Sequence, residues 1–157
     1  FLYDSDSYSD DLPYWESRNK KKQLIIPYTL DNNDMRFATN QGFNTGDHFY
    51  SYLKDSFDAL YEEGRTNPKM MSVGLHCRII GKPGRIQSLK KFLDFHRVFY
   101  AKHYKIIGDN KSAQFYLKDV NKDNIQFKMK ILFNTPSFIL FQLFQFKKWW
   151  LKKGINL

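Results

Sequence analysis

The chain has 157 residues and a net charge of +9, which is enough length for one ordinary domain with a buried core. Its single cysteine, Cys77, excludes an intramolecular disulfide and a cysteine-based zinc site. The four histidines are His48, His76, His96 and His103, and no two of them are four residues apart, as two ligands on one helix face would be. We therefore expect this chain alone to hold no metal or other cofactor.

The charge is unevenly distributed and divides the chain in two. Residues 1–95 hold 13 basic and 13 acidic residues, whereas residues 96–157 hold 12 basic, 3 acidic and 13 aromatic residues. We predict an α/β region at 1–95 and a basic, aromatic-rich tail at 96–157. The tail is either a read-through segment foreign to the rest of the protein or a surface for nucleic acid or anionic lipid. No RNP motif or zinc finger accompanies it, and its apolar run at 137–146 is too short to cross a bilayer, so we do not expect nucleic acid or a membrane as a partner.

Strands and helices are predicted to alternate in the first region. Residues 22–28 form a short apolar strand that enters a polar loop at 31–36, and residues 69–75 form a second strand. A helix begins near Thr45 and ends at Gly64, and another spans 84–95 after Pro83. The first helix has one apolar face, formed by Phe49, Leu53, Phe57 and Leu60. This alternation predicts a parallel sheet with helices outside, compatible with part of a barrel.

His76 is the strongest candidate for chemistry, because it follows an apolar strand and precedes a glycine-containing loop at 81–84. Side chains at the carboxyl ends of such strands face the substrate crevice. An imidazole can donate a proton at neutral pH, so His76 is a candidate general acid; the alternative is a histidine whose hydrogen bonds only complete a strand end. Arg78 and Arg85 are candidates for binding a carboxylate or an oxyanion, or else are surface arginines.

Two other loops are predicted to lie beside the same crevice. The acidic and aromatic loop at 10–15 contributes Asp11, Tyr14 and Trp15 as candidate substrate-binding residues, although its tryptophan could equally cap the core. The loop after the first strand contributes Asp34 and Arg36, for which a local turn held by the aspartate is the alternative. We predict that His76, Asp34 or Arg36, and Trp15 converge at the carboxyl ends of their strands.

Three separated motifs carry a resemblance to a known family. They are Asp10-Asp-Leu-Pro-Tyr-Trp15, Leu24-Ile-Ile-Pro-Tyr-Thr-Leu-Asp-Asn-Asn-Asp-Met-Arg-Phe37, and Met71-Ser-Val-Gly-Leu-His-Cys-Arg78, supported by Gly42-Phe43 and Thr45-Gly46-Asp47. In this order, over residues 1 to about 95, they resemble the C-terminal third of polysaccharide deacetylases of the NodB-homology type, in particular the allantoinase-like branch. The resemblance implies a partial (β/α) barrel of the polysaccharide-deacetylase type, followed by a tail that is foreign to the family.

The same resemblance implies a function. In that family the histidine of the third motif is the general acid, a role that carries over to His76, whereas the metal-binding aspartate and histidines and the general base lie in an N-terminal part with no counterpart here. We expect a fragment of a cytoplasmic hydrolase that acts on a non-peptide C–N bond of an N-acetyl sugar or of allantoin and is inactive alone. The partners that this resemblance leads us to expect are a small-molecule substrate and further copies of the same chain in a homo-oligomer. The alternatives are a catalytically dead remnant, or a basic nucleic-acid or membrane-surface binder acting through the tail.

Overall fold

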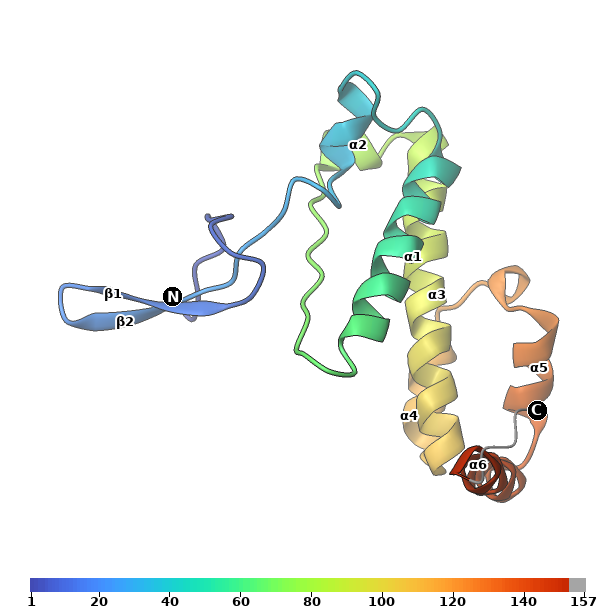
Figure 1. Ribbon diagram of the computed structural model, residues 1–157. Coiled ribbons are helices and arrows are strands. Elements are labelled where there is room, and N and C mark those ends of the chain that lie inside the picture. Colours follow the sequence, from blue (N-terminus) through green and yellow to red (C-terminus); the bar gives the residue numbers. More distant parts are fainter. Residues whose placement is uncertain (153–157) are drawn as a thin grey trace. The chain divides into compact units, whose positions relative to one another are not determined.

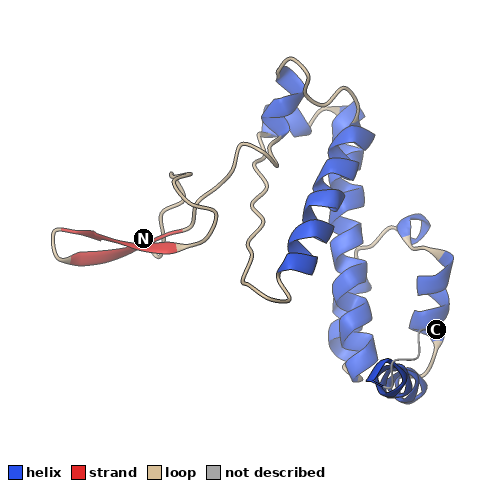
Figure 2. Ribbon diagram, viewed as in Figure 1, coloured by secondary structure: helices blue, strands red, loops and turns tan. Residues whose placement is uncertain are grey.

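The computed structural model describes residues 1–152, which contain a small amount of strand and much helix (Figures 1 and 2). The chain divides into two compact units, Phe1–Lys90 and Lys91–Leu157. The first unit contains β1 (Tyr14–Arg18), β2 (Lys21–Ile25), η1 (Asp34–Ala38), α1 (Gly46–Glu63) and α2 (Cys77–Ile80), and the second contains α4 (Asn110–Leu117), η2 (Lys122–Asn124), α5 (Phe127–Asn134) and α6 (Ser137–Lys152). Helix α3 (Pro83–Ile107) begins in the first unit and ends in the second.

The sheet of the first unit is a two-stranded antiparallel hairpin, β1–β2, in which Trp15 pairs with Leu24. Its two-residue turn has positive φ at both Asn19 (50°) and Lys20 (64°), the geometry of a type I′ turn, whose twist suits a hairpin. Ahead of β1, Asp4 forms an isolated parallel bridge to Ile25. The described residues therefore form an open sheet, and the predicted parallel sheet and barrel are not seen among them.

The predicted strand at 69–75 is wrong. Residues 68–73 belong to no strand, and the segment makes one isolated parallel bridge, between Asn33 and Gly74. The physical reason is that a strand needs neighbours whose backbone groups complete its ladder, and the described residues supply a partner only at Gly74. The predicted strand at 22–28 is confirmed only as far as Ile25; beyond it lies Pro27, which has no backbone N–H to offer a ladder.

The predicted helix after Thr45 is confirmed as α1. The Thr45 hydroxyl accepts a hydrogen bond from the backbone N–H of His48 at 3.2 Å and so caps the helix, which ends at Gly64. Phe49 and Leu53 on its apolar face are fully buried. The Phe49 ring lies 5.5 Å from Phe37 and 5.4 Å from Phe43, so these aromatic rings form the core beside η1 and α1.

The second unit is helical and contains its own buried groups. Helix α3 continues well past residue 95 and ends at Ile107; the next residue, Gly108, has a φ of 91°, a conformation that favours glycine. The buried carboxylate of Asp94 accepts hydrogen bonds from the backbone N–H of Asn121 at 3.2 Å and from Asn124 Nδ2 at 2.7 Å, which joins α3 to η2. Within residues 1–152, no helix is both long and apolar enough to cross a membrane.

Candidate functional site

A carboxylate–imidazole pair, Asp34 and His76, lies where η1 meets α2. His76 Nδ1 is 2.6 Å from Asp34 Oδ1. The Asp34 side chain is fully buried, whereas the His76 side chain is 47% exposed. The pair therefore joins a buried, fixed carboxylate to a ring whose outer edge reaches solvent.

Asp34 also caps α2. Its Oδ2 accepts hydrogen bonds from the backbone N–H groups of His76 at 2.8 Å and Ile80 at 3.0 Å. His76 is the N-cap residue of α2, but its own side chain caps nothing. A carboxylate 42 residues earlier in the chain thus satisfies N–H groups at this helix start and sets the position of His76.

The bridge between Asn33 and Gly74 brings the two halves of this site together. The N–H of Asp34 donates to the carbonyl of Gly74 at 3.0 Å, and the N–H of Gly74 donates to the carbonyl of Asn32 at 2.9 Å. The Asn33 side chain accepts from the N–H of Met35 at 2.9 Å and caps η1. A Cβ on Gly74 would lie 2.2 Å from Asn33 Nδ2, so any other residue here would displace the Asn33 side chain that caps η1.

The geometry assigns roles to the two nitrogens of the imidazole ring. An ionised carboxylate can only accept hydrogen bonds, so Nδ1 of His76 carries a proton toward Asp34. Nε2 is then left as the nitrogen that can exchange a proton with another molecule. The pair has the arrangement of a general acid with an orienting carboxylate.

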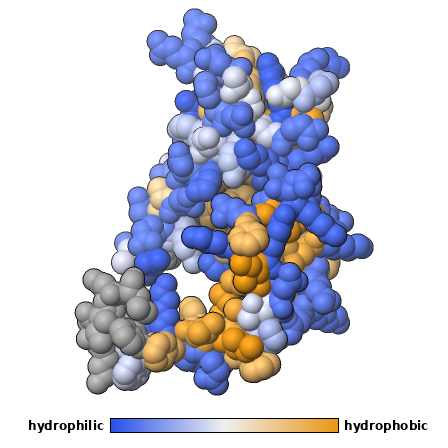
Figure 3. Space-filling view, turned by 90° about the vertical axis from the view of Figure 1, so that its right-hand side faces the viewer, coloured by the Kyte–Doolittle hydropathy of each residue, from blue (hydrophilic) through white to orange (hydrophobic). Residues whose placement is uncertain are grey.

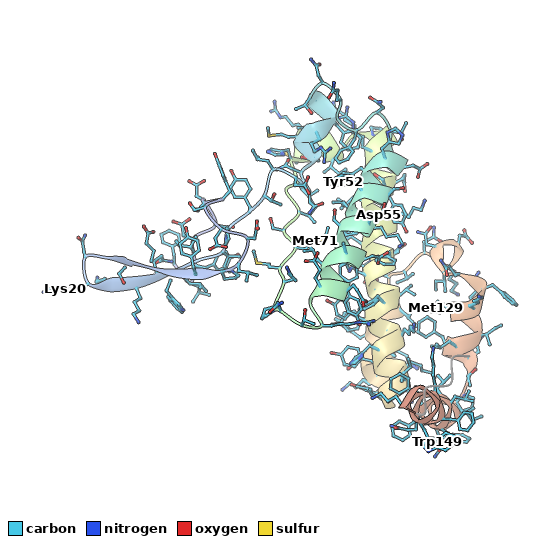
Figure 4. All side chains as sticks on the ribbon, in the orientation of Figure 1. Lys20, Tyr52, Asp55, Met71, Met129 and Trp149 are labelled. Carbon is cyan, nitrogen blue, oxygen red and sulfur yellow. The ribbon has the colours of Figure 1, made fainter. Side chains whose placement is uncertain are left out.

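The predicted arginines lie in different surroundings. The Arg36 guanidinium is 4.7 Å from the ring centre of Phe43 and 4.4 Å from that of Tyr52, and it forms an ion pair with Asp31 at 3.4 Å. Tyr52, labelled on α1 in Figure 4, donates a hydrogen bond to Asp31 as well. Arg36 is therefore held by its own structural contacts, and no described contact joins it to His76.

Arg78 lies in α2, and Arg85 lies in the first turns of α3 and contacts α2. The Arg85 guanidinium lies over the Phe37 ring at 4.6 Å, and its Nη1 donates to the carbonyl of Ile79 in α2 at 3.3 Å. Arg78 is exposed on α2, two residues after His76. Of the three predicted arginines, Arg78 is the one in the short helix that His76 precedes as N-cap residue.

The residues predicted from the 10–15 loop are not joined to His76 by any described contact. Trp15 is 65% exposed in the hairpin, and Tyr14 Oη lies 3.1 Å from Ser7 Oγ. Asp11 lines a cavity of about 420 Å³ whose wall also includes Asp31 and Asn32. Asp34 and His76 do not line this cavity, so the cavity and the carboxylate–imidazole pair are separate features.

Sequence reasoning named Asp34 and His76 separately but missed what joins them. Asn33 and Gly74 position the pair, and the one signal for them is the glycine within an otherwise apolar segment, which often marks a close backbone approach. Among the described residues, no group of three or more His, Cys, Asp or Glu side chains could hold a metal ion. The described residues therefore do not form the metal site that the resemblance places in the family's N-terminal part.

Comparison with known proteins finds similarity to polysaccharide deacetylases and to an allantoinase. No family model matches it. A putative polysaccharide deacetylase of Schizosaccharomyces pombe is 48% identical over 102 residues, which cover 59% of this chain and 32% of the relative. This chain therefore spans about a third of the length of that curated relative.

Two crystal structures are also similar. Puue allantoinase is 60% identical with a TM-score of 0.57, over 61% of this chain and 32% of the other. A probable polysaccharide deacetylase from Pseudomonas aeruginosa PAO1 is 47% identical with a TM-score of 0.55, over 80% of this chain and 41% of the other. The resemblance that the three sequence motifs predicted is confirmed: this chain is a relative of polysaccharide deacetylases and of allantoinase.

Proposed function

We propose that this chain supplies the general acid of a hydrolase that cleaves non-peptide C–N bonds. The observation that supports this most directly is the 2.6 Å contact between a fully buried carboxylate, Asp34, and a partly exposed imidazole, His76. The contact engages only Nδ1, and the 47% exposure of the His76 side chain leaves the ring within reach of another molecule. In this proposal Asp34 orients His76 and does not itself touch the substrate.

The step proposed for His76 transfers one proton. Water attacks the carbonyl carbon of an amide or ureide and gives one proton to the general base that the family resemblance places in the N-terminal part. This produces a tetrahedral oxyanion, and the C–N bond then breaks. His76, protonated on both nitrogens, donates the Nε2 proton to the departing nitrogen as that bond breaks and becomes neutral. Asp34 stays ionised and holds Nδ1–H throughout, so the same face of the ring is always presented. Of the predicted arginines, Arg78 is the nearest to His76 in the sequence, and it is exposed on α2. We therefore assign it to stabilise the oxyanion.

The substrate class that we propose is a cyclic ureide such as allantoin, with an N-acetyl sugar as the alternative. The support is the higher identity to Puue allantoinase, 60%, than to the two deacetylases, at 47% and 48%. Both substrates present a carbonyl carbon bonded to a nitrogen that must gain a proton as it leaves. The acid role of His76 is therefore the same for either.

The proposal is tested with a chimera. In this chimera, residues 1–95 replace the segment that they match in Puue allantoinase. Turnover of allantoin and of N-acetylglucosamine oligomers is then compared for the chimera, its His76→Gln variant and, as a matched control, its His48→Gln variant, since His48 is an exposed histidine of α1. We expect His76→Gln to lower kcat by roughly 10²–10⁴-fold with little change in KM, and His48→Gln to leave both unchanged.

The isolated chain gives the complementary measurement. We expect no measurable turnover of either substrate by the purified chain, because an acid alone does not activate the attacking water. An unchanged kcat for the His76→Gln chimera would refute the acid role. Robust turnover by the purified chain would show that it holds the whole catalytic apparatus, and would exclude a catalytically dead remnant as well.

A further inference from the structure

The last two helices, α5 and α6, expose large apolar side chains. Phe127 and Ile131 on α5, and Phe138, Leu143, Phe146 and Trp149 on α6, are each more than half exposed, with Phe138 at 71%. Figure 3 shows hydrophobic surface gathered on the lower part of one face, and Figure 4 labels Met129 and Trp149 on these two helices. We call these six residues the α5–α6 surface. Monomeric soluble proteins rarely expose such a concentration of apolar side chains without a binding role.

The charge on the same segment has one sign. From residue 124 to the end of the chain there are six lysines and neither aspartate nor glutamate. Two of these lysines, Lys147 and Lys148, lie in α6 beside Trp149, and the Lys148 ammonium is 4.8 Å from the Phe144 ring centre. A partner of this surface must therefore accept apolar side chains and provide negative charge close to them.

Against the expectation from the sequence alone, we propose that the α5–α6 surface binds the surface of an anionic lipid membrane. Phenylalanine, leucine and tryptophan side chains enter the boundary between headgroups and acyl chains, while lysines contact the anionic headgroups. In this proposal helix α6 lies along the membrane surface. Its 16 residues span about 24 Å at 1.5 Å per residue, which is less than the roughly 30 Å thickness of the hydrocarbon core. This inference is independent of the catalytic proposal, because it uses no residue before Phe127.

Two other partners fit the same residues less well. A nucleic acid would use the lysines and stack on the aromatic rings, but it would leave Ile131 and Leu143, which have no π-face, against a polar backbone. A second copy of the chain in a two-fold dimer would bring the same patch to both sides of the interface. Lys147 and Lys148 would then face lysines, with no acidic side chain in the segment to pair with them.

Vesicle binding by the full chain is the test. All proteins in this test carry Trp15→Phe, so that tryptophan fluorescence comes from Trp149 and Trp150 alone. The emission wavelength is followed while the protein is titrated with vesicles of phosphatidylcholine alone or of phosphatidylcholine mixed with phosphatidylserine. The charge variant is Lys147→Gln with Lys148→Gln. Its matched control is Lys21→Gln with Lys22→Gln in β2, which removes the same charge from another exposed lysine pair.

The proposal predicts a blue shift with the anionic vesicles and none with the neutral ones. It further predicts partitioning weakened on the order of 30-fold in the α6 charge variant and little in the β2 control. Circular dichroism checks that each variant retains its helix content. If a variant misfolds, the chain that keeps all its lysines still tests the proposal through its binding to the two vesicle types. Equal binding to both vesicle types, or equal weakening by the two lysine pairs, would overturn the proposal. So would tighter binding to a single-stranded oligonucleotide than to the vesicles, or a stable dimer in sedimentation without lipid.

Discussion

Replacing Asp34 tests the structural half of the account, because this carboxylate both caps α2 and orients His76. Alanine at this position removes an acceptor of two backbone N–H groups, those of His76 and Ile80; the Ile80 N–H keeps its second acceptor, the His76 carbonyl at 3.0 Å. Hydrogen bonds to a charged group contribute about 1.5–3 kcal/mol each, so the two together give at most about 3–6 kcal/mol. That is a large share of the roughly 5–15 kcal/mol by which a typical domain is stable.

Asparagine at the same position separates the two roles of Asp34. Its amide oxygen still accepts from both backbone groups, but as neutral bonds of about 0.5–1.5 kcal/mol each, so we expect a loss of about 2–3 kcal/mol. Urea unfolding followed by circular dichroism measures both variants, with Asp55→Asn on an exposed position of α1 as the matched control, expected to lie within about 0.5 kcal/mol of the unsubstituted chain. If Asp34→Ala unfolds at the same urea concentration as Asp55→Asn, then Asp34 does not hold α2 as described.

Three further substitutions test other parts of the structure. Gly74→Ala should destabilise the chain, because the added Cβ would overlap the Asn33 side chain. Gly84→Ala in the first turn of α3 should stabilise the chain by up to about 1 kcal/mol, because nothing lies within 4 Å of the added carbon. If the urea midpoints of both variants move in the same direction, the close approach at Gly74 is contradicted. Phe49→Ala should cost about 3–5 kcal/mol in the same unfolding assay, because the ring is fully buried against other aromatic rings, and a cost below about 1 kcal/mol would argue against this core. Hydrogen bonds from the hydroxyl and backbone N–H of Ser112 hold the pKa of Asp109 below its ordinary value of 3.8. The stabilisation that these bonds give is therefore present above pH 3.8 and is lost as the pH falls through the lowered pKa. Asp109→Asn still caps α4, and between pH 7 and pH 3 this variant should lose less stability than the unsubstituted chain.

The sequence predicted best those features whose signals lie within one element. For α1 these are the Thr45 cap, the apolar face and Gly64, all inside or next to the helix, and α1 is confirmed. For α3 the start is confirmed, but the helix was expected to end near residue 95, where the family motifs fade. The local signal was the better guide, since the chain has neither glycine nor proline between Gly84 and Gly108.

Features that depend on distant partners could not be predicted in the same way. The apolar segment at 69–75 has the composition of a strand, but strand formation depends on which backbone lies beside it, and the described residues pair with it only at Gly74. The run at 137–146 fits helix and strand equally by composition, and it is helix in α6. His76 and Asp34 were both named, yet their contact joins residues 42 positions apart, and the sequence offers no rule that pairs them.

The protonation pattern of the His76 ring tests the central claim most directly. In a chain labelled with ¹⁵N-histidine, long-range ¹H–¹⁵N correlation spectra distinguish the two neutral tautomers, and the His76→Gln variant assigns the signals. The account predicts that neutral His76 carries its proton on Nδ1, toward Asp34, and that Asp34→Asn shifts the population toward the Nε2–H form, because an amide NH₂ can donate to Nδ1. A neutral ring already protonated on Nε2 in the unsubstituted chain would contradict the orienting contact, and with it the proposal that Asp34 holds His76 as a general acid.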